Sequence, residues 1–262
     1  MGVLDRFSLK GRTALVTAGA GPQFGSSISH GLAEAGATVV TASRSLETNL
    51  EFSETLQQRG FEATGMALDI RNPDSIHQVR DDILARFGRL DILVNNARAV
   101  IEGGFDAEGP DDWIDCAKGD MAGLFALTKA FLPSMIAQGR GSVINISSIY
   151  GVVGNDPTLY EGTEMLHQQS PAYSFSKGGM VNATRYLAAF YGKSNIRFNS
   201  ISPGGFFNHQ PELFLKRYCD RVPLGRMMGD EDLKGAVVFL ASDASAYVTG
   251  INLMVDGGWT AV

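Results

Sequence analysis

Short apolar runs alternate with longer amphipathic stretches along the whole chain of 262 residues. Several of these runs, such as 13–17 and 142–146, are apolar or β-branched almost throughout and do not alternate with polar residues. That pattern is typical of strands covered on both faces, as in a parallel sheet. The expected strands are 13–17, 38–41, 63–68, 90–94, 142–146, 197–201 and 252–255.

Amphipathic stretches separate these strands and are expected to form helices. They cover 26–35, 48–59, 73–87, 112–137, 172–191 and 231–241. Parallel strands need crossover connections, and helices packed on the sheet supply them. The sequence therefore predicts an α/β fold, a doubly wound parallel sheet of about seven strands (a Rossmann fold). No repeat, linker or low-complexity tract interrupts the pattern, so residues 1–262 are expected to form a single domain.

The composition narrows the classes of partner. With 22 Lys and Arg against 28 Asp and Glu, the formal charge is −6, whereas a nucleic-acid-binding face needs the opposite balance. No apolar run approaches the ~18 residues that span a bilayer, and the first residues lack the apolar stretch of a signal peptide. Cys116, Cys219 and the four histidines share no ligand spacing, so no metal site is expected. We expect a cytoplasmic protein without nucleic-acid or membrane partners.

A glycine-rich turn, residues 18–25, lies between the first expected strand and the first helix. Glycines there permit a tight turn and let a pyrophosphate approach the helix N-terminus, where free N–H groups and the dipole favour an anion. Such a turn is a weak signal alone, because plain turn geometry also explains it. In a doubly wound sheet it predicts a dinucleotide site at Gly19, Gly21, Phe24 and Gly25.

Ser43 and Arg44 follow the second expected strand. An acidic residue at this point would accept hydrogen bonds from the ribose hydroxyls and select NAD(H). A guanidinium beside a hydroxyl suits a 2′-phosphate, because charge-assisted hydrogen bonds are strong. We therefore expect NADP(H) in preference to NAD(H); the alternative is that Arg44 is a solvated loop charge.

Tyr173 and Lys177 lie four residues apart at the start of an expected helix, so they share one face of it. An unperturbed phenol titrates near ~10 and is a poor acid–base group at neutral pH, but a neighbouring ammonium favours the phenolate. Ser148 follows the strand 142–146 at the sheet edge where ligands bind, and its hydroxyl can hold a carbonyl or alcohol oxygen against the phenol. The alternative is that these residues have no catalytic role: Tyr173 and Lys177 would then lie on the surface of a helix, and Ser148 would only cap a helix or stabilise a turn.

Taken together and in this order, the motifs resemble those of the short-chain dehydrogenase/reductase family over essentially the whole chain. The matching positions are the turn 17–25, Asp69, Asn95-Asn96-Ala97, Ser148, Tyr173, Lys177, Pro203-Gly204 and the ending 255–259. The resemblance implies hydride transfer between the nicotinamide and a carbonyl or alcohol carbon. Tyr173 would exchange the proton, Ser148 would orient the oxygen, and Lys177 would favour the phenolate and hold the nicotinamide ribose. Further implied cofactor contacts are Asp69, Ile70, Asn96, Ala97, Pro203, Gly204 and Phe206.

The chain departs from the family pattern in four places. The glycine turn is one residue longer, with Ala18 and Gln23 where glycines are usual. Arg98 replaces the glycine of NNAG, and is expected either to contact a phosphate or substrate anion or to point outward. Asp120 replaces the asparagine that is the fourth catalytic residue of the family. Asp120 is expected to accept hydrogen bonds, and its charge is expected either to strengthen Lys177 as a cation or to pair with Arg98. The alternative is that Asp120 weakens the family's water relay to the lysine. The fourth departure is an inserted loop near 155–171.

The insert is expected to overhang the mouth of the site, because it joins the catalytic strand to the catalytic helix. A second segment near 205–221, including Asn208, resembles the family's mobile substrate loop. Polar groups in the insert favour a sugar, polyol or sugar-acid derivative over a steroid or a long acyl chain; they are Tyr160, Glu161, Glu164 and His167.

Two other functions stay open. A 3-oxoacyl reductase would use the same catalytic residues, with Arg98, Lys216 and Arg217 as candidates to hold a carrier phosphate. A catalytically impaired nucleotide-binding scaffold or sensor is the alternative outside enzymes. The family further implies a homotetramer or homodimer built on helices 112–137 and 172–191. Phe125, Phe131, Phe190 and Tyr191 are expected either at that interface or in the core.

Overall fold

The computed structural model describes residues 2–98, 108–165 and 170–262. These residues contain one seven-stranded parallel sheet in the order β3-β2-β1-β4-β5-β6-β7. The strands are β1 Thr13–Thr17, β2 Thr38–Ser43, β3 Ala63–Ala67, β4 Ile92–Asn95, β5 Gly141–Ile146, β6 Ile196–Pro203 and β7 Asn252–Val255. The predicted doubly wound sheet is confirmed, and its order reverses between β1 and β4, the point where ligands bind in such folds.

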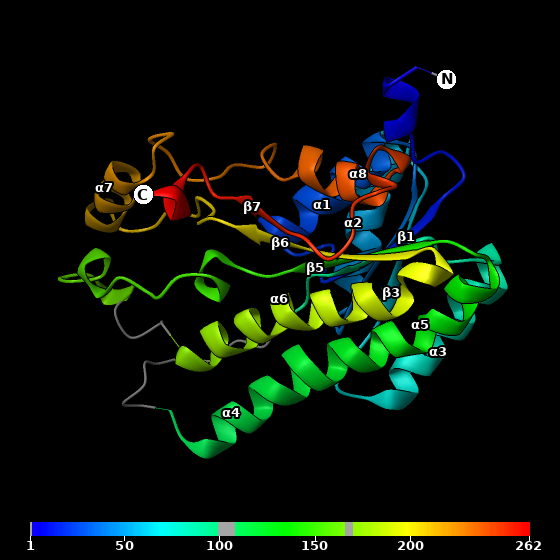
Figure 1. Cartoon of the computed structure of the whole chain (residues 1–262), viewed down its shortest axis with the longest axis horizontal. Helices are drawn as coiled ribbons and strands as arrows, with labels where there is room; N and C mark the ends of the chain where they lie inside the picture. The colour runs from blue at the N-terminus through cyan, green and yellow to red at the C-terminus, as the bar shows by residue number, and fades with distance from the viewer. Residues whose placement is uncertain (1, 99–107, 166–169) are drawn as a thin grey trace.

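Helices cover both faces of the sheet (Figure 1). One face carries α1 Phe24–Glu34, α2 Leu46–Gln58 and α8 Lys234–Ala241; the other carries α3 Pro73–Phe87, α5 Leu124–Ala137 and α6 Pro171–Tyr191. Each face has its own core, with Leu32 and Leu240 on the first and Phe131 and Phe198 on the second. Burial on both sides explains why β1 is apolar at successive positions.

The helix expected over 112–137 consists of three parts. α4 Pro110–Cys116 leads into the π-helical η2 Ala117–Gly123, which continues as α5. The spacing of apolar side chains cannot reveal a local change from i→i+4 to i→i+5 hydrogen bonds, so the sequence did not predict this segment. By length and composition, 110–137 could cross a membrane, but its inner side chains Leu127 and Phe131 are fully buried in the core.

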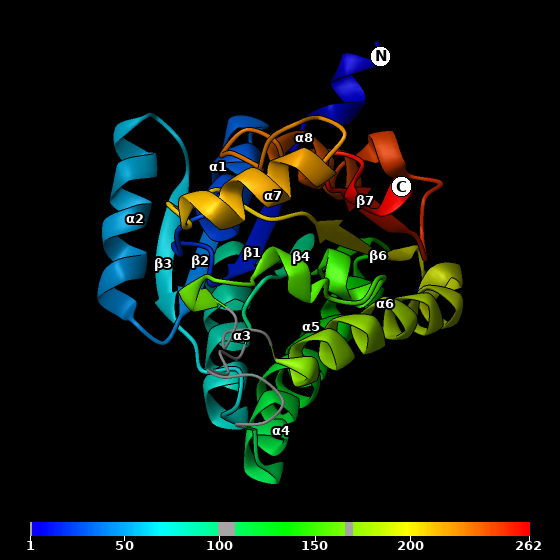
Figure 2. The same ribbon diagram turned by 90° about the vertical axis from the view of Figure 1, so that its left-hand side faces the viewer.

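The expected substrate loop near 205–221 contains a helix, α7 Glu212–Arg221. It lies beside the C-terminus at one end of the molecule (Figures 1 and 2). The remaining short helical turns are η1 Leu4–Phe7, η3 Ile149–Gly151, η4 Pro157–Leu159, η6 Gly192–Ser194, η7 Asp243–Ser245 and η8 Trp259–Ala261.

The described part of the insert is fastened to α7. Arg217 donates to Thr158 O at 3.0 Å and to Glu161 O at 2.6 Å, and Arg221 forms an ion pair with Asp156. A third apolar cluster fills the space between the insert, α7 and the C-terminal turn; it includes Leu159, Tyr160, Phe214, Tyr218 and Trp259. The part of the insert before residue 166 is therefore packed on α7. His167, a predicted polar group of the insert, lies outside the described residues.

Candidate active site

The predicted site residues follow the carboxyl ends of parallel strands, which meet at one edge of the sheet. In strand order they are the turn after β1, Ser43 and Arg44 at β2, Asp69 and Ile70 after β3, Asn96 and Ala97 after β4, Ser148 after β5, and Pro203 and Gly204 at β6. The fold therefore places all these candidates on the same edge.

Two hydrogen bonds join the end of β5 to α6. Ser147 Oγ donates to Lys177 O at 2.9 Å, and Lys177 Nζ donates to Ile146 O at 2.9 Å. Gly151 permits this approach, because a Cβ there would lie only 2.8 Å from the Lys177 carbonyl carbon. Ser148 is consequently held against the helix that carries Lys177.

Tyr173 occupies the first turn of α6. Ser170 caps the helix, with its Oγ accepting from Tyr173 N at 3.3 Å, and Pro171 is the first helical residue. Lys177 Nζ lies 5.6 Å from the centroid of the Tyr173 ring. The structure thus brings the hydroxyl, phenol and amine predicted from the sequence to one end of α6.

Ser148 and Lys177 keep hydrogens available for a ligand. Ser148 Oγ accepts from Tyr150 N at 3.1 Å, so its own O–H is not used by that bond. Lys177, only 3% exposed, uses one of three donors on Ile146 O. Within the described chain no second acceptor contacts this ammonium. Both groups can therefore donate to oxygen atoms placed beside Tyr173.

Asp120 sits in the π-helical η2 and is 3% exposed. Ser176 Oγ lies 3.3 Å from Asp120 Oδ2 and 2.9 Å from Tyr173 O. Asp120 therefore reaches α6 between Tyr173 and Lys177 by way of a serine that the sequence argument did not single out. The position of Ser176 could have been noticed in the sequence, because a hydroxyl three residues after Tyr173 on a helix can hydrogen-bond to the preceding turn.

The glycine turn and the segment after β4 are tied together. The backbone N–H groups of Asn96 and Ala97 donate to Thr17 Oγ1 at 2.9 and 2.8 Å, and Asn96 Nδ2 donates to Thr17 O at 3.1 Å. Gly25 packs directly on Ala18 O, leaving no room for a Cβ. This close packing holds the start of α1 at the sheet edge.

The start of α1 fits a pyrophosphate. Its cap residue, Gln23, makes no side-chain cap bond, and the N–H groups of Phe24 and Gly25 have no acceptor in the part of the chain that the structure describes. Free N–H groups at a helix N-terminus are a binding site for anions. Ala18 (φ 51°) and Gln23 (φ 70°) both adopt positive φ, so the turn has glycine-like geometry at the two positions that lack glycine.

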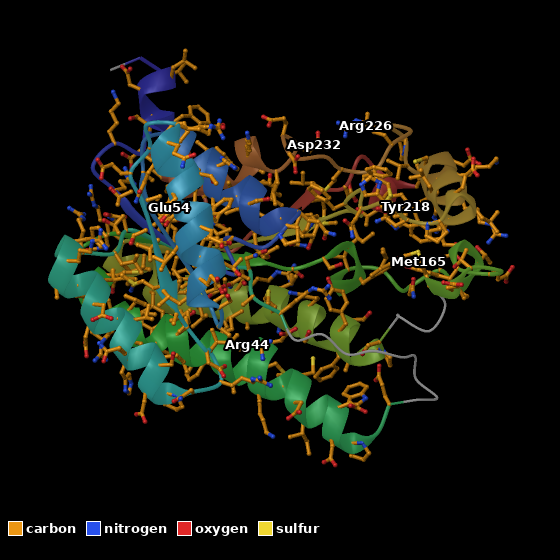
Figure 3. All side chains as sticks on the ribbon, turned by 180° about the vertical axis from the view of Figure 1, so that it is seen from behind. Arg44, Glu54, Met165, Tyr218, Arg226 and Asp232 are labelled. Carbon is orange, nitrogen blue, oxygen red and sulfur yellow. The ribbon has the colours of Figure 1, made fainter. Side chains whose placement is uncertain are left out.

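Ser43 ends β2, and Arg44 follows it in the short connection to α2 (Figure 3). Ser43 Oγ accepts from Asn49 Nδ2 at 2.8 Å, which leaves its hydrogen free, and Arg44 is exposed without a hydrogen bond or ion pair to any described residue. Asn49 is fully buried and was missed from the sequence, because a single asparagine in a helix carries no motif. The pair presents an O–H and a guanidinium, which fits a phosphate.

The neighbouring cofactor candidates also contact described partners. Asp69 Oδ1 accepts from Arg71 N at 2.9 Å, and Ile70 O contacts Gly123 so closely that a Cβ there would lie 2.5 Å away. Phe206 packs edge-to-face on Phe24, with ring centroids 5.5 Å apart.

The loop after β6 is fixed as well. Gly204 N donates to Val255 O at 2.9 Å, and Gly205 N donates to Tyr218 Oη at 2.5 Å. Asn208 is exposed, and its backbone N–H donates to Gln210 Oε1. The cofactor roles of all these residues stay predictions.

The polar residues expected at the mouth of the site are only partly exposed to solvent. Tyr160 is buried rather than presented to solvent: it packs on Phe214 and hydrogen-bonds Tyr150, oxygen to oxygen, at 2.7 Å. Burial raises the pKa of Tyr160 to about 12. Glu161 and Glu164 are exposed as expected.

Two of the residues expected either at an interface or in the core belong to the core. Phe131 is fully buried, and Tyr191 packs on Phe198 with ring centroids 5.9 Å apart. Phe125 and Phe190 are exposed on α5 and α6, together with Phe175 and Tyr186. An apolar face therefore remains on these two helices.

A protein-family model described as enoyl-(acyl carrier protein) reductase matches residues 19–260. The chain is 34% identical to the 2-dehydro-3-deoxy-D-gluconate 5-dehydrogenase of Escherichia coli, over 99% of both chains. It is 32% identical to a 3-oxoacyl-(acyl-carrier-protein) reductase of Pseudomonas aeruginosa, over 96% of this chain and 98% of that one.

Among solved structures, a gluconate 5-dehydrogenase from Burkholderia cenocepacia in complex with NADP and tartrate superposes with a TM-score of 0.89 at 33% identity, covering 100% of both chains. Relatives with NADP bound support use of a nicotinamide dinucleotide by this chain. The chain is therefore an oxidoreductase of the short-chain dehydrogenase/reductase family.

Proposed function

We propose that this chain is an NADP(H)-dependent dehydrogenase/reductase that acts on a secondary alcohol or ketone of a sugar, polyol or sugar-acid derivative. The observation that carries the proposal is the Ser147–Lys177 hydrogen bond, because it holds Ser148 against the helix that presents Tyr173 and Lys177. A bound dinucleotide supplies the hydride chemistry.

The residues have distinct roles in this proposal. Ser148 donates its free hydrogen to the reacting oxygen and orients it, and the Tyr173 phenol exchanges a proton with that oxygen. Lys177, which uses one donor on Ile146 O, offers its remaining donors to the ribose. Asp120 and Ser176 position the first turns of α6.

Replacing Tyr173 by Phe tests turnover. The variant keeps the ring and removes the proton donor, so we expect at least a 10²-fold loss of NADPH-dependent reduction, the usual size of a general acid–base contribution. Tyr247→Phe, at a fully exposed tyrosine outside the site, is the matched control. Equal rates in Tyr173→Phe and the unchanged protein would instead support the nucleotide-binding scaffold.

The preference for NADP(H) rests on Ser43, Arg44 and Asn49. Asn49 uses one lone pair of Ser43 Oγ and so leaves its hydrogen to donate to a 2′-phosphate, beside the uncommitted Arg44 guanidinium. We expect Arg44→Ser to raise KM for NADPH by about 10-fold or more, with little change for NADH. A lower KM for NADH than for NADPH in the unchanged protein would contradict the assignment.

The substrate class is supported by the relatives and by the mouth. The relatives cited above include dehydrogenases of a sugar acid, while exposed Glu161 and Glu164 on the insert offer polar contacts. The insert near 155–171 and the segment 205–221 would frame this substrate. A panel of keto sugars, polyols and aldonic acids set against hydrophobic ketones tests it, and turnover of hydrophobic ketones alone would count against it.

The 3-oxoacyl reductase alternative has less support. It needs cations for a carrier phosphate, but Lys216 pairs with Asp220 at 2.7 Å and Arg217 donates to carbonyls of the insert. Of the three candidates, only Arg98 is uncommitted.

A homo-oligomer is supported by the exposed aromatic face on α5 and α6. Tyr186 and Phe190 stack at 5.0 Å between centroids although both are more than half exposed. An apolar patch of this kind is typical of an interface. We expect sedimentation to give a dimer or tetramer and Phe190→Lys to shift it toward monomer. Leu4→Lys, at an exposed residue near the N-terminus, is the control.

A cytoplasmic location accords with Cys116 and Cys219, which are both free thiols. Reduced cysteines are typical of the cytosol. Cell fractionation would test the assignment.

A further inference from the structure

Arg98 stands where the family pattern has a glycine, so the pattern assigns it no role. Among the described cationic residues of the site, it is the one that lacks both such a role and a hydrogen-bond partner. Its guanidinium lies 5.9 Å from the centroid of the Tyr173 ring, and it is exposed. It forms no hydrogen bond or ion pair with any residue in 2–98, 108–165 or 170–262. Its N–H donors are therefore not used by any described residue, although the guanidinium lies beside Tyr173.

The position of Arg98 is fixed by its neighbours. Asn96 and Ala97 are bound to Thr17 Oγ1 through both backbone N–H groups, which anchors the chain immediately before Arg98 at the sheet edge. From this anchor the side chain reaches Tyr173 on α6. The backbone before Arg98 is thus fixed within side-chain reach of Tyr173.

The cofactor phosphates have other partners. The free N–H groups of Phe24 and Gly25 suit the pyrophosphate, and Ser43 with Arg44 suits the 2′-phosphate. The other cation beside the Tyr173 ring, Lys177, is buried and already bound to Ile146 O. Arg98 is therefore the cation left for an anion on the substrate side.

We propose that Arg98 binds a carboxylate of the substrate, so that the enzyme selects hydroxy or keto acids of the sugar-acid class over neutral polyols. A guanidinium binds a carboxylate with two parallel hydrogen bonds, which fixes orientation as well as charge. Because the guanidinium lies 5.9 Å from the centroid of the Tyr173 ring, one small molecule could contact both Arg98 and Tyr173. The inference rests on the proposed function in that it takes the substrate to bind beside Tyr173.

The test measures binding and turnover separately. Calorimetry would titrate D-gluconate and its neutral counterpart D-glucitol into the Tyr173→Phe protein saturated with NADP⁺, in which turnover adds no heat, and the Arg98 variants would be compared in this same background. We expect gluconate to bind about 10- to 100-fold more tightly than glucitol, the range for hydrogen bonds to a charged group. Arg98→Gln should abolish that difference, Arg98→Lys should keep part of it, and the affinity for NADP⁺ should be unchanged in both.

Arg185→Gln is the matched control, because it removes the same charge from an exposed position on α6. Equal binding of the two probes to the Tyr173→Phe protein, or gluconate binding that Arg98→Gln leaves intact in it, would overturn the inference. So would a loss of NADP⁺ affinity in Arg98→Gln, since Arg98 would then hold the cofactor. Arg98-dependent binding of gluconate without turnover of any secondary alcohol would leave the inference standing and refute the proposed function.

Discussion

The phenol oxygens of Tyr150 and Tyr160 lie 2.7 Å apart and are hydrogen-bonded to each other. Tyr150 is two residues after Ser148, while Tyr160 belongs to the insert and packs on Phe214 of α7. The same bond therefore links the turn that carries Ser148 to the described part of the insert and, through it, to α7.

Replacing Tyr160 by Phe should weaken this link. The variant leaves the Tyr150 hydroxyl without its partner, so we expect the free energy of unfolding to fall by about 1–2 kcal/mol. Denaturant unfolding measures the change, with Tyr247→Phe on the surface as the control. Equal stability of the Tyr160 variant and the unchanged protein would show that water replaces the bond.

The buried phenols predict a loss of stability at alkaline pH. Burial raises the pKa of Tyr160 and of Tyr218 from 10 to about 12, so both stay protonated in the folded protein after they ionise in the unfolded chain. Their stabilisation is complete below pH 10 and is lost as pH rises toward 12, by about 2–3 kcal/mol for each phenol. Unfolding measured between pH 9 and 12 should show this slope, and Tyr160→Phe should make it shallower.

Gln23→Gly should stabilise the protein. Gln23 adopts φ 70° and ψ −117°, a conformation that suits glycine and strains a residue with a Cβ. After the larger backbone entropy of glycine in the unfolded chain is subtracted, we expect a gain of about 1 kcal/mol. Gln58→Gly, at the exposed end of α2, should instead destabilise. Thermal unfolding without cofactor would compare the two, and a lower melting temperature for Gln23→Gly would refute the strain argument.

Two substitutions of Asp120 distinguish between a role of its hydrogen bond and a role of its negative charge. Asn retains an oxygen that can accept from Ser176 Oγ, so Asp120→Asn should cost less than about 1 kcal/mol, whereas Asp120→Leu should cost about 2–3 kcal/mol. Denaturant unfolding would compare the two variants, and the kcat of Asp120→Asn would be measured in parallel. If Asn destabilises as much as Leu, the carboxylate charge itself holds η2 against α6.

Much of the fold could be predicted from side-chain pattern alone. Runs such as β1 and β5 are buried on both faces, and only strands in a covered parallel sheet need that composition. The π-helical η2 could not be predicted in this way, because it depends on backbone hydrogen bonding. The helix α7 was expected only as part of a loop, although Phe214, Tyr218 and Val222 recur at helical spacing and pack into one apolar cluster.

The candidate site, like the fold, contains some residues that could be predicted from the sequence and others that could not. Tyr173 and Lys177 were predictable because helical spacing places them on one face, and Ser148 because it follows a buried strand. The partners Ser176 and Asn49 were not, since single polar residues within helices gain meaning only from contacts made across the fold. The burial of Tyr160 likewise depends on α7, which lies more than fifty residues further along the chain.

Gly151 allows η3 to rest on the backbone of Lys177. The distance between Ser148, which follows β5, and Lys177 on α6 therefore depends on the absence of a side chain at residue 151. A single methyl group at this position would push η3 away from α6 and displace Ser148 relative to Lys177 without altering either residue.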